Sequence, residues 1–531
     1  MTKQSIAYKD TGYFSKLMCD YLDEASSLQE FYGNFPKLAN FQKQIALKKE
    51  SFSAESRAVL VDSLQKQYKN ITLSEATQKN ITSLSEENTF TITTGHQLNL
   101  FTGPLYFLYK IFSVINLSEQ LKKAYPDSNF VPVYWMATED HDFEEINYFN
   151  LFGKKVQWKR KDGGAVGELS TEGLADVAAI LLKQFGDSEN GKALSSLFSE
   201  AYLKHDNLAE ATRDLGNALF AKYGLVIVDG NDTDLKKAFV PYAHKEIESQ
   251  LSFNKITKTT QKLTALGYPE QVHPREINLF YLDKGIRERI IEKDGRFYIN
   301  ETTLEFSKDE LLELIEAAPE KFSPNALLRP LYQEVILPNL CYIGGGGEVA
   351  YWLQLKDYFE SVSVPFPVLL LRNSVLLMPT YLSEKLKKME VPLESLFLKQ
   401  SDLRTKHTHQ ISEVAIDFST QRTHLEQQFK DLYNLAEKTD ASFKGAVGAQ
   451  EKKQLNGLDH LEKRLLKAQK RKLKDELERL TELQNELFPN QGLQERTLNF
   501  SEFYLEYGDI LLSELKENLD PLHHEFTILE L

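Results

Sequence analysis

Four short, uninterrupted apolar runs and one threonine-rich, β-prone run constrain the fold of this chain more than any other feature. Runs of this length without polar alternation are typical of parallel strands that are covered on both faces. In chain order, they are the threonine-rich run 89–94 and the apolar runs 130–137, 225–228, 340–343 and 368–371. Because helical patterns lie between them, the sequence predicts a doubly wound α/β core.

The first two runs flank a long, largely apolar stretch at 105–121. A strand, a buried helix and a second strand at this spacing form a βαβ unit, which joins parallel neighbours. Further helices are expected at 325–337 and 348–359. These elements place the strand ends on one edge of a common sheet.

Two segments, 146–169 and 277–300, interrupt the α/β pattern and resemble antiparallel β structure. In the second segment, the turns at 283–285 and 293–295 each end in glycine, which is a hairpin signal. We interpret both segments as insertions that overhang the carboxyl edge of the sheet.

The C-terminal part changes in texture, because glycine becomes scarce and Glu, Lys, Leu and Gln dominate. Apolar side chains recur there at spacings of three and four, which favours an antiparallel coiled-coil hairpin. The two predicted seams are Leu425, Phe429, Leu432, Ala436 and Leu473, Leu477, Leu480, Gln484, Leu487. We expect 444–448 to form the turn and 498–531 to fold back as a helix plus tail.

These patterns divide the chain into three parts. Residues 1–88 are predicted to be a helical region that packs on the core, and 89–378 form the α/β core. The core carries insertions near 146–172 and 255–305. Residues 379–531 form the helical coiled-coil domain and its tail.

The composition excludes several classes of partner. A net charge of −14 and a pI near 5.5 argue against a broad nucleic-acid surface, which needs basic stripes. Cys19 and Cys341 support neither a disulfide framework nor a cysteine metal site. The N-terminus shows no signal-peptide h-region, and no apolar run reaches the roughly 18–20 residues of a membrane span. We therefore expect a cytoplasmic protein with small-molecule or soluble protein partners.

The first candidate site follows the first strand. Gly95, His96 and Gln97 stand where the backbone must turn, and ligands of open α/β sheets bind at such strand ends. Thr102 and Gly103 precede the buried helix, whose N-terminus would favour an anion. The alternative interpretation is a tight strand–helix turn with a structural histidine.

The second candidate site follows the next strand, which ends near Trp135. Glu139, Asp140, His141 and Asp142 form an acidic cluster whose spacing matches no established metal-ligand pattern. The cluster could bind an amine or a ribose, hold Mg²⁺, or supply a general base. Alternatively, these residues are an N-cap and the acids of a first helical turn.

The third candidate site lies around the fourth strand. Arg329 is a candidate clamp for a carboxylate or phosphate, unless it pairs with Glu334 or Glu348. Glycines between strand and helix allow a ligand to approach the backbone, unless they form a hinge. The remaining candidate binding residues of this region are Asn325, Gly345, Gly346, Glu348 and Arg372.

Several motifs in this order resemble the BshC family, the cysteine ligase of bacillithiol biosynthesis. The motifs are 94–97 with 100–106, Trp135 with 139–142, 278–280, Arg329-Pro330 with Gln333-Glu334, and Gly344 with Gly347-Glu348 and 350–352. The resemblance covers nearly the whole chain. It implies a Rossmann-like core related to nucleotidyltransferases and class I aminoacyl-tRNA synthetases, with connecting-peptide insertions. It also implies a coiled-coil domain that forms a homodimer.

The resemblance further implies that cysteine is joined to the amine of glucosaminyl-malate, with ATP and Mg²⁺ as candidate cofactors. His96 would then stabilise developing charge, an acid among Glu139, Asp140 and Asp142 would hold the amine, and Arg329 would clamp the malyl carboxylates. Two alternatives remain open. One is a nucleotidyl- or glycosyl-transferase on the same core, and the other is a non-enzymatic coiled-coil scaffold.

Overall fold

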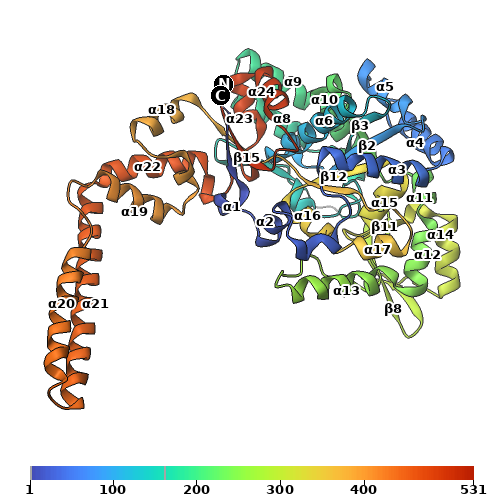
Figure 1. Ribbon diagram of the computed structural model, residues 1–531. Helices are drawn as coiled ribbons and strands as arrows, with labels where there is room; N and C mark the ends of the chain where they lie inside the picture. Colours follow the sequence, from blue (N-terminus) through green and yellow to red (C-terminus); the bar gives the residue numbers. More distant parts are fainter. Residues whose placement is uncertain (1–2, 161–162) are drawn as a thin grey trace. The chain divides into compact units, whose positions relative to one another are not determined.

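The computed structural model describes residues 3–160 and 163–531. The chain divides into two compact units, drawn in sequence colours in Figure 1. The core unit comprises Lys3–Leu376 and Glu495–Leu529. The helical unit comprises Leu377–Gln494 and Glu530–Leu531.

A five-stranded parallel sheet is the centre of the core unit, and it confirms all five predicted strands. The order is β13-β12-β2-β3-β6, so the chain winds outward from β2 in both directions. The carboxyl ends of β2 and β12 therefore flank a topological switch point, where open α/β sheets bind ligands. The strands are β2 Thr89–His96, β3 Asn129–Met136, β6 Val226–Asp229, β12 Asn339–Gly344 and β13 Val368–Leu371.

The predicted buried helix is α6 (Tyr106–Ala124), which packs against β2 and β3. Its residues from Phe107 to Ser118 are all buried, including the single charged residue Lys110. The predicted helix at 325–337 is α15, and the one at 348–359 is divided into α16 and α17. Other core helices are α3 Phe41–Ser51, α4 Ala54–Gln67, α5 Glu75–Ser83, α10 Leu208–Phe220, α11 Thr233–Lys237, α12 Val240–Ser249, α13 Leu251–Ala265, α15 Arg329–Ile336, α16 Gly346–Trp352 and α17 Lys356–Ser361.

Both insertions contain antiparallel β structure. The first is a single pair, β4 (Tyr148–Leu151) with β5 (Lys154–Gln157), so the prediction for 146–169 is right only for its first half. The helices α8 (Leu174–Phe185) and α9 (Glu189–Leu203) follow. The second insertion is a five-stranded sheet of order β10-β9-β8-β7-β11. Its strands and helix are β7 Leu279–Asp283, β8 Ile286–Lys293, β9 Arg296–Ile299, β10 Glu305–Phe306, β11 Phe322–Pro324 and α14 Lys308–Ala317.

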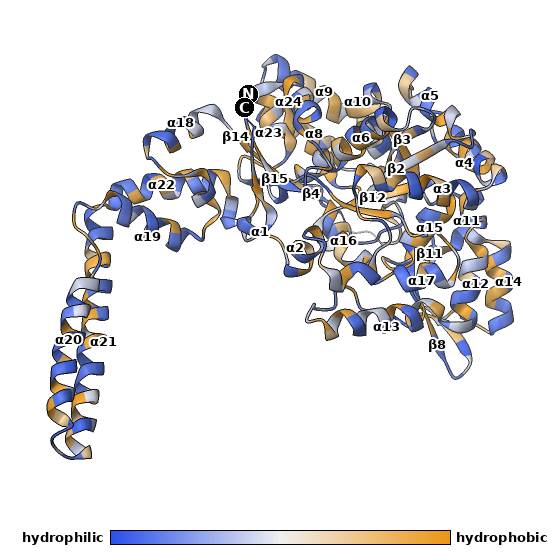
Figure 2. Cartoon of the chain, in the orientation of Figure 1, coloured by the Kyte–Doolittle hydropathy of each residue, from blue (hydrophilic) through white to orange (hydrophobic). Residues whose placement is uncertain are grey.

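The helical unit contains the expected hairpin, formed by α20 (Ser419–Ala436) and α21 (Ala441–Lys472). These helices carry hydrophobic residues mixed with many hydrophilic ones (Figure 2). The turn predicted at 444–448 is wrong, because Asp440 caps α21 by accepting a hydrogen bond from the Phe443 amide. Gly448 instead lies inside α21, where an added Cβ would stand 3.0 Å from the Tyr433 hydroxyl.

The second predicted seam does not belong to this hairpin. Leu477 and Leu480 lie on α22 (Lys474–Leu487), which packs against α19 (Gln400–Ile411). Gln484, expected as a polar member of the seam, donates hydrogen bonds to two backbone carbonyls that precede α19. In the hairpin itself, Phe429, Ala436 and Val447 form the buried cluster. The unit also contains α18 Thr380–Lys388.

The N- and C-terminal segments of the core unit meet in an antiparallel strand pair. β15 (Glu525–Glu530) pairs with β1 (Lys3–Ala7), and it follows α23 (Phe500–Tyr507) and α24 (Asp509–Asn518). The segment predicted as one helix plus a tail thus contains two helices, and its tail is a strand. The N-terminal segment, predicted to be helical throughout, contains this strand besides its helices. Its first helices are α1 Tyr8–Thr11 and α2 Lys16–Leu22.

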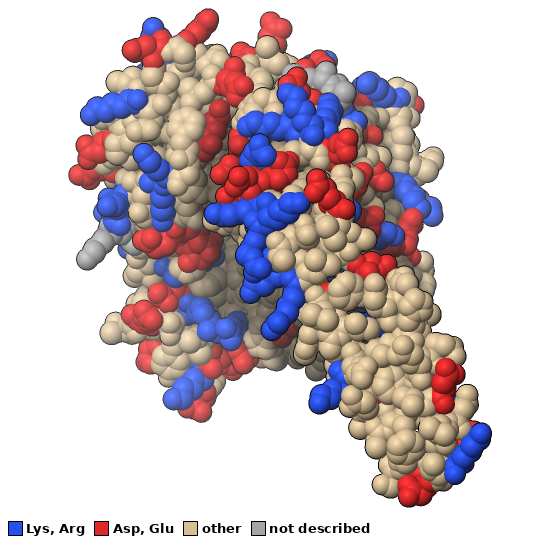
Figure 3. All heavy atoms as spheres, turned by 90° about the vertical axis from the view of Figure 1, so that its left-hand side faces the viewer, with Lys and Arg blue, Asp and Glu red and all other residues tan. Residues whose placement is uncertain are grey.

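Two observations bear on partners. Among the described residues, no helix is both long and apolar enough to cross a membrane. On the face shown in Figure 3, Lys and Arg gather near the middle with Asp and Glu beside them, so no single charge covers that face.

Candidate active site

A cavity of about 460 Å³ lies at the carboxyl ends of β2 and β12, and we call it the switch-point pocket. Nine of the candidate residues line it: Gly95, His96, Gln97, Trp135, Arg329, Gly345, Gly346, Glu348 and Arg372. The remaining lining residues were not predicted: Tyr106, Lys110, Ala137, Tyr342, Gly347, Tyr351 and Arg496. The topology therefore brings together residues as far apart in sequence as Gly95 and Arg496.

Gly95 allows the end of β2 to approach β12 closely. A Cβ at this position would lie 3.1 Å from the Tyr342 hydroxyl and 3.8 Å from Arg329 Nη1. The Gly95 carbonyl accepts a 2.6 Å hydrogen bond from Lys110 Nζ. The absence of a side chain at Gly95 therefore lets the strand end lie close to Tyr342 and Arg329, while its carbonyl binds Lys110.

His96 is a buried, neutral group. Its ring lies 4.9 Å from the ring of Phe107 and 5.4 Å from that of Tyr106. Burial and the nearby charge of Lys110 lower the pKa of His96 to about 3. Its Nε2 is buried without a hydrogen-bond partner within 3–160 and 163–531. At neutral pH the ring is therefore uncharged, and its free nitrogen can form a hydrogen bond with a ligand.

Lys110, which is buried, and Glu348, which is partly exposed, form an ion pair in the pocket wall, with Nζ 2.6 Å from Oε2. Glu348 also accepts hydrogen bonds from the Tyr342 hydroxyl at 2.7 Å and the Gly345 amide at 2.8 Å. Burial alone would raise the pKa of Glu348, but Lys110 and these donors lower it to about 2. Lys110 could have been noticed in the sequence as the single lysine of the apolar stretch 105–121.

Arg329 stands among aromatic rings. Its guanidinium carbon lies 5.4 Å from the ring of Tyr342, 5.8 Å from that of Trp135 and 5.9 Å from that of Trp352. Nη1 donates to Gln333, and buried Nη2 has no partner in the described part of the chain. Neither ion pair considered for Arg329 forms within that part.

Glu334 instead pairs with Lys48, with Nζ 3.1 Å from Oε2. The guanidinium of Arg329 is therefore left without a carboxylate partner among residues 3–160 and 163–531. Its position over the pocket suits a planar anion that approaches from the cavity.

Arg372 follows β13 and is bound by an acid that the sequence analysis missed. Its two η nitrogens lie 3.0 and 2.8 Å from the carboxylate of Glu495. Burial alone would lower the pKa of Arg372, but Glu495 raises it. Nε is buried and has no partner among the residues described. No local pattern links Glu495 to Arg372, because the helical unit separates them in sequence.

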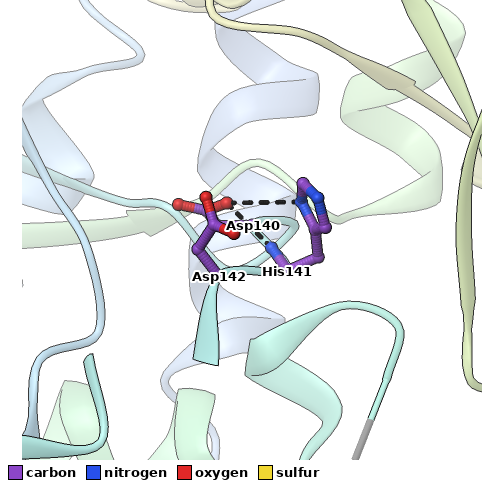
Figure 4. Close-up of side chains that lie close together, drawn as sticks. All are labelled: Asp140, His141 and Asp142. Atoms are coloured by element: carbon purple, nitrogen blue, oxygen red, sulfur yellow. Dashed lines mark hydrogen bonds and ion pairs between the residues drawn. The ribbon is translucent and has the colours of Figure 1, made fainter. Parts of the chain in front are cut away.

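The acidic loop after β3 lies beside the pocket rather than in its wall. Asp140 Oδ2 accepts a 2.9 Å hydrogen bond from Gln97, which does line the pocket. Oδ1 accepts from the His141 amide at 2.8 Å (Figure 4). Burial would raise the pKa of Asp140, but these bonds and Arg287 hold it well below its usual range. Glu139 pairs with buried Lys236 at 2.5 Å.

The donor atoms of Asp140, His141 and Asp142 lie within 4.8 Å of one another, so the cluster can be tested as a metal site. Mg²⁺ requires carboxylate oxygens that are free to coordinate it. Each oxygen of Asp140 already accepts one hydrogen bond, and Arg287 Nη1 lies 2.7 Å from His141 Nδ1, so a guanidinium occupies the ligand atom of the histidine and the three-residue ligand set is incomplete. The cluster in this arrangement does not fit a resident Mg²⁺, and we assign it no metal.

Three candidate residues have structural roles outside the pocket wall. Thr102 (φ 69°) and Gly103 (φ 64°) form a tight loop, and α6 begins only at Tyr106. The anion site expected at the helix N-terminus is therefore not built from these two residues. The Asn325 side chain accepts hydrogen bonds from two amides of its own turn and donates to Asn278.

The comparisons with known proteins cover the whole chain. A family model described as "Bacillithiol biosynthesis BshC, N-terminal Rossmann-like domain" matches residues 1–373, and one described as "Bacillithiol biosynthesis BshC, C-terminal coiled-coil domain" matches residues 375–531. Two relatives are each 56% identical and carry the name "Putative cysteine ligase BshC". The one from Christiangramia forsetii covers 100% of this chain and 99% of its own length. The one from Flavobacterium johnsoniae covers 100% of both. A relative of the same name from Staphylococcus saprophyticus is 29% identical, with 95% of each chain covered.

Proposed function

The chain belongs to the BshC family of bacillithiol biosynthesis, and on that premise we propose that it catalyses the last step, in which the carboxylate of cysteine is joined to the amine of glucosaminyl-malate. The bond formed is an amide, and the enzyme is accordingly a carbon–nitrogen ligase. The switch-point pocket is the proposed site of this reaction.

The observation that carries the proposal is a set of unused polar atoms in one cavity. His96 Nε2, Arg329 Nη2 and Arg372 Nε are buried without partners among the described residues, and all three residues line the pocket. A buried polar group left unpaired costs about 1–3 kcal/mol. A ligand rich in carboxylate oxygens removes this cost, and the malyl group carries two carboxylates.

Asp140 suits an anchor for the incoming amine rather than a base. Its lowered pKa keeps the carboxylate ionised at neutral pH, so it attracts an ammonium group but is a weak proton acceptor. The hydrogen bond from Gln97 connects this carboxylate to the pocket wall. Glu139 and Asp142 add negative charge to the same loop, which favours a cation there.

The pocket also fits a phosphate-bearing group. Arg372 and Arg496 line it, and a Cβ added at Gly347 would meet no atom within 4 Å, so a ligand can approach this backbone. We propose ATP as the activator, held by these residues. When bound, the nucleotide supplies activation of the cysteine carboxylate, because an amine does not displace hydroxide at neutral pH. The neutral ring of His96 can then form a hydrogen bond at the reacting centre without changing its charge.

The direct test is mass spectrometry of purified protein incubated with cysteine and glucosaminyl-malate, with and without ATP. We expect the amide product, and we expect His96→Ala and Asp140→Ala to abolish it while the protein stays folded. The exposed loop variant Asp187→Ala serves as the matched control and retains activity. Consumption of a sugar nucleotide without any amide product would instead identify a transferase on the same core.

We propose that the protein forms a homodimer through the α20–α21 hairpin. Leu435 on α20 is 52% exposed and Leu461 on α21 is 53% exposed, which leaves apolar area for a second copy. We expect the double variant Leu435→Lys with Leu461→Lys to be a monomer, so that the molecular mass measured by sedimentation equilibrium is half that of the wild type. A dimer that persists in this variant would place the interface elsewhere.

We assign the reaction to the cytoplasm, consistent with the free thiols of Cys19 and Cys341.

A further inference from the structure

A second cavity, of about 230 Å³, lies at the carboxyl end of β6, and we call it the β6-edge pocket. Thr138 lines it, whereas the preceding residue, Ala137, lines the switch-point pocket. The two cavities are therefore close neighbours on either side of the chain that leaves β3. Its lining residues include Thr138, Glu168, Ala209, Arg213 and Asp229.

Arg213 is the unusual group of this pocket. It projects from α10 and is only 4% exposed. Nη2 donates to Gln67 at 3.1 Å, and Nε is buried without a partner. Within the described ranges, no carboxylate lies at ion-pair distance from its guanidinium. A buried guanidinium is normally paired with an anion, so this one has unused binding capacity.

Negative charge lies in the same cavity but is not paired with Arg213. Asp229 Oδ1 accepts hydrogen bonds from the Thr138 hydroxyl and, at 2.8 Å, from the Asn231 amide. Glu168, Glu210 and Asp232 add three more carboxylates to the lining. A single ligand that carries both an anionic and a cationic group would complement this arrangement.

We propose that the β6-edge pocket binds a small α-amino acid, with its carboxylate on Arg213 and its ammonium group on Asp229 and Glu168. The cavity volume favours a small ligand, because pockets that bind drug-sized molecules measure about 300–1,000 Å³. The identity of the amino acid as cysteine rests on the proposed function. The class of ligand rests only on the charges of the pocket.

The experiment is isothermal titration calorimetry of the full-length protein with L-cysteine, L-serine, cysteamine and 3-mercaptopropionate. The last two lack the carboxylate and the ammonium group, respectively. We expect cysteine to bind, and each truncated analogue to bind at least about tenfold more weakly, as for the loss of one charged hydrogen-bonded group. Arg213→Gln should weaken cysteine binding by a similar factor but leave cysteamine binding unchanged.

A second variant, which fills the cavity, tests the proposal even if Arg213→Gln folds poorly. Ala209→Met places a longer side chain in the cavity without altering any charge, and it should abolish cysteine binding. The matched control is Ala179→Met on the exposed side of α8, which should bind cysteine normally. Cysteine binding that is unchanged in both Arg213→Gln and Ala209→Met would overturn the proposal.

This outcome can be separated from failure of the proposed function. If amide product forms but Arg213→Gln leaves the KM for cysteine unchanged, the pocket assignment is wrong and the function stands. If no product forms but cysteine binds in an Arg213-dependent manner, the pocket assignment stands and the function does not.

Discussion

The switch-point pocket and the β6-edge pocket lie at the same edge of one sheet but treat buried charge in opposite ways. In the first, Lys110 and Glu348 neutralise each other at 2.6 Å, and the unused groups are donors on other residues. In the second, Arg213 and Asp229 share a cavity without forming an ion pair in the described part of the chain. Internal pairing stabilises a fold, whereas charges held apart are available to a ligand.

The sharpest test of this difference compares Lys110→Met with Arg213→Met in chemical unfolding. Loss of Lys110 leaves the partly buried Glu348 without its charged partner, which should lower the free energy of unfolding by about 3 kcal/mol. Loss of Arg213 removes one hydrogen bond to Gln67 and a cation–π contact with Tyr68, and it should cost about 1–2 kcal/mol. All three tryptophans, Trp135, Trp158 and Trp352, lie in the core unit, so fluorescence reports on it alone.

A control distinguishes the ion pair from simple packing. The double variant Lys110→Met with Glu348→Met should recover most of the lost stability, because no charge is then left unpaired. Equal losses for Lys110→Met and Arg213→Met would remove the distinction between the two pockets.

Arg329 provides the next largest effect, now on the reaction. Arg329→Met should lower kcat/KM by about 10²–10³-fold, as for loss of one preorganised donor at a reacting centre. Arg329→Lys should restore little, because an ammonium group lacks the planar fork that matches a carboxylate. Steady-state kinetics of each variant should give kcat and the KM for each of the two substrates. The comparison predicts that Arg329 variants raise the constant for glucosaminyl-malate and Arg213 variants raise that for cysteine.

The smallest effect concerns pH. His96 has a pKa of about 3 in the folded protein against 6.5 for an unperturbed histidine. Between these values the unfolded chain binds a proton that the folded protein does not, so stability is lost as the pH falls below about 6.5. From pH 7 to pH 5.5 this residue should contribute a loss of about 1 kcal/mol.

Unfolding of His96→Gln at both pH values checks this expectation. The variant should lose less stability than the wild type, while the exposed control His273→Gln should behave as the wild type. His96 lines the switch-point pocket and not the β6-edge pocket, so His96→Gln should leave cysteine binding unchanged. An identical pH dependence in His96→Gln and wild type would show that His96 is not held neutral by burial.

Much of the core could be predicted because its signals are local. Apolar runs identified four of the five strands and a threonine-rich, β-prone run the fifth, and Gly95 stood out near the end of β2 and Arg329 at the start of α15. The turn of the hairpin was placed wrongly because Gly445 and Gly448 were interpreted as loop residues. Gly448 instead lets the Tyr433 side chain of the other helix lie close to α21, and nothing in the neighbouring sequence indicates this contact. The division at 88 and 378 stays a prediction.

The sequence by itself determined the alternation of strands and helices, the hydrophobic faces and the family, since each depends on residue order or short-range periodicity. Only the tertiary structure decided which polar groups are paired. Lys110 meets Glu348, Arg372 meets Glu495, and Arg213 meets no carboxylate in the described ranges, although each lies far from its neighbours in sequence. The physical reason is that pairing depends on distances of a few ångströms, which are set by the packing of strands and helices rather than by the chain's local pattern.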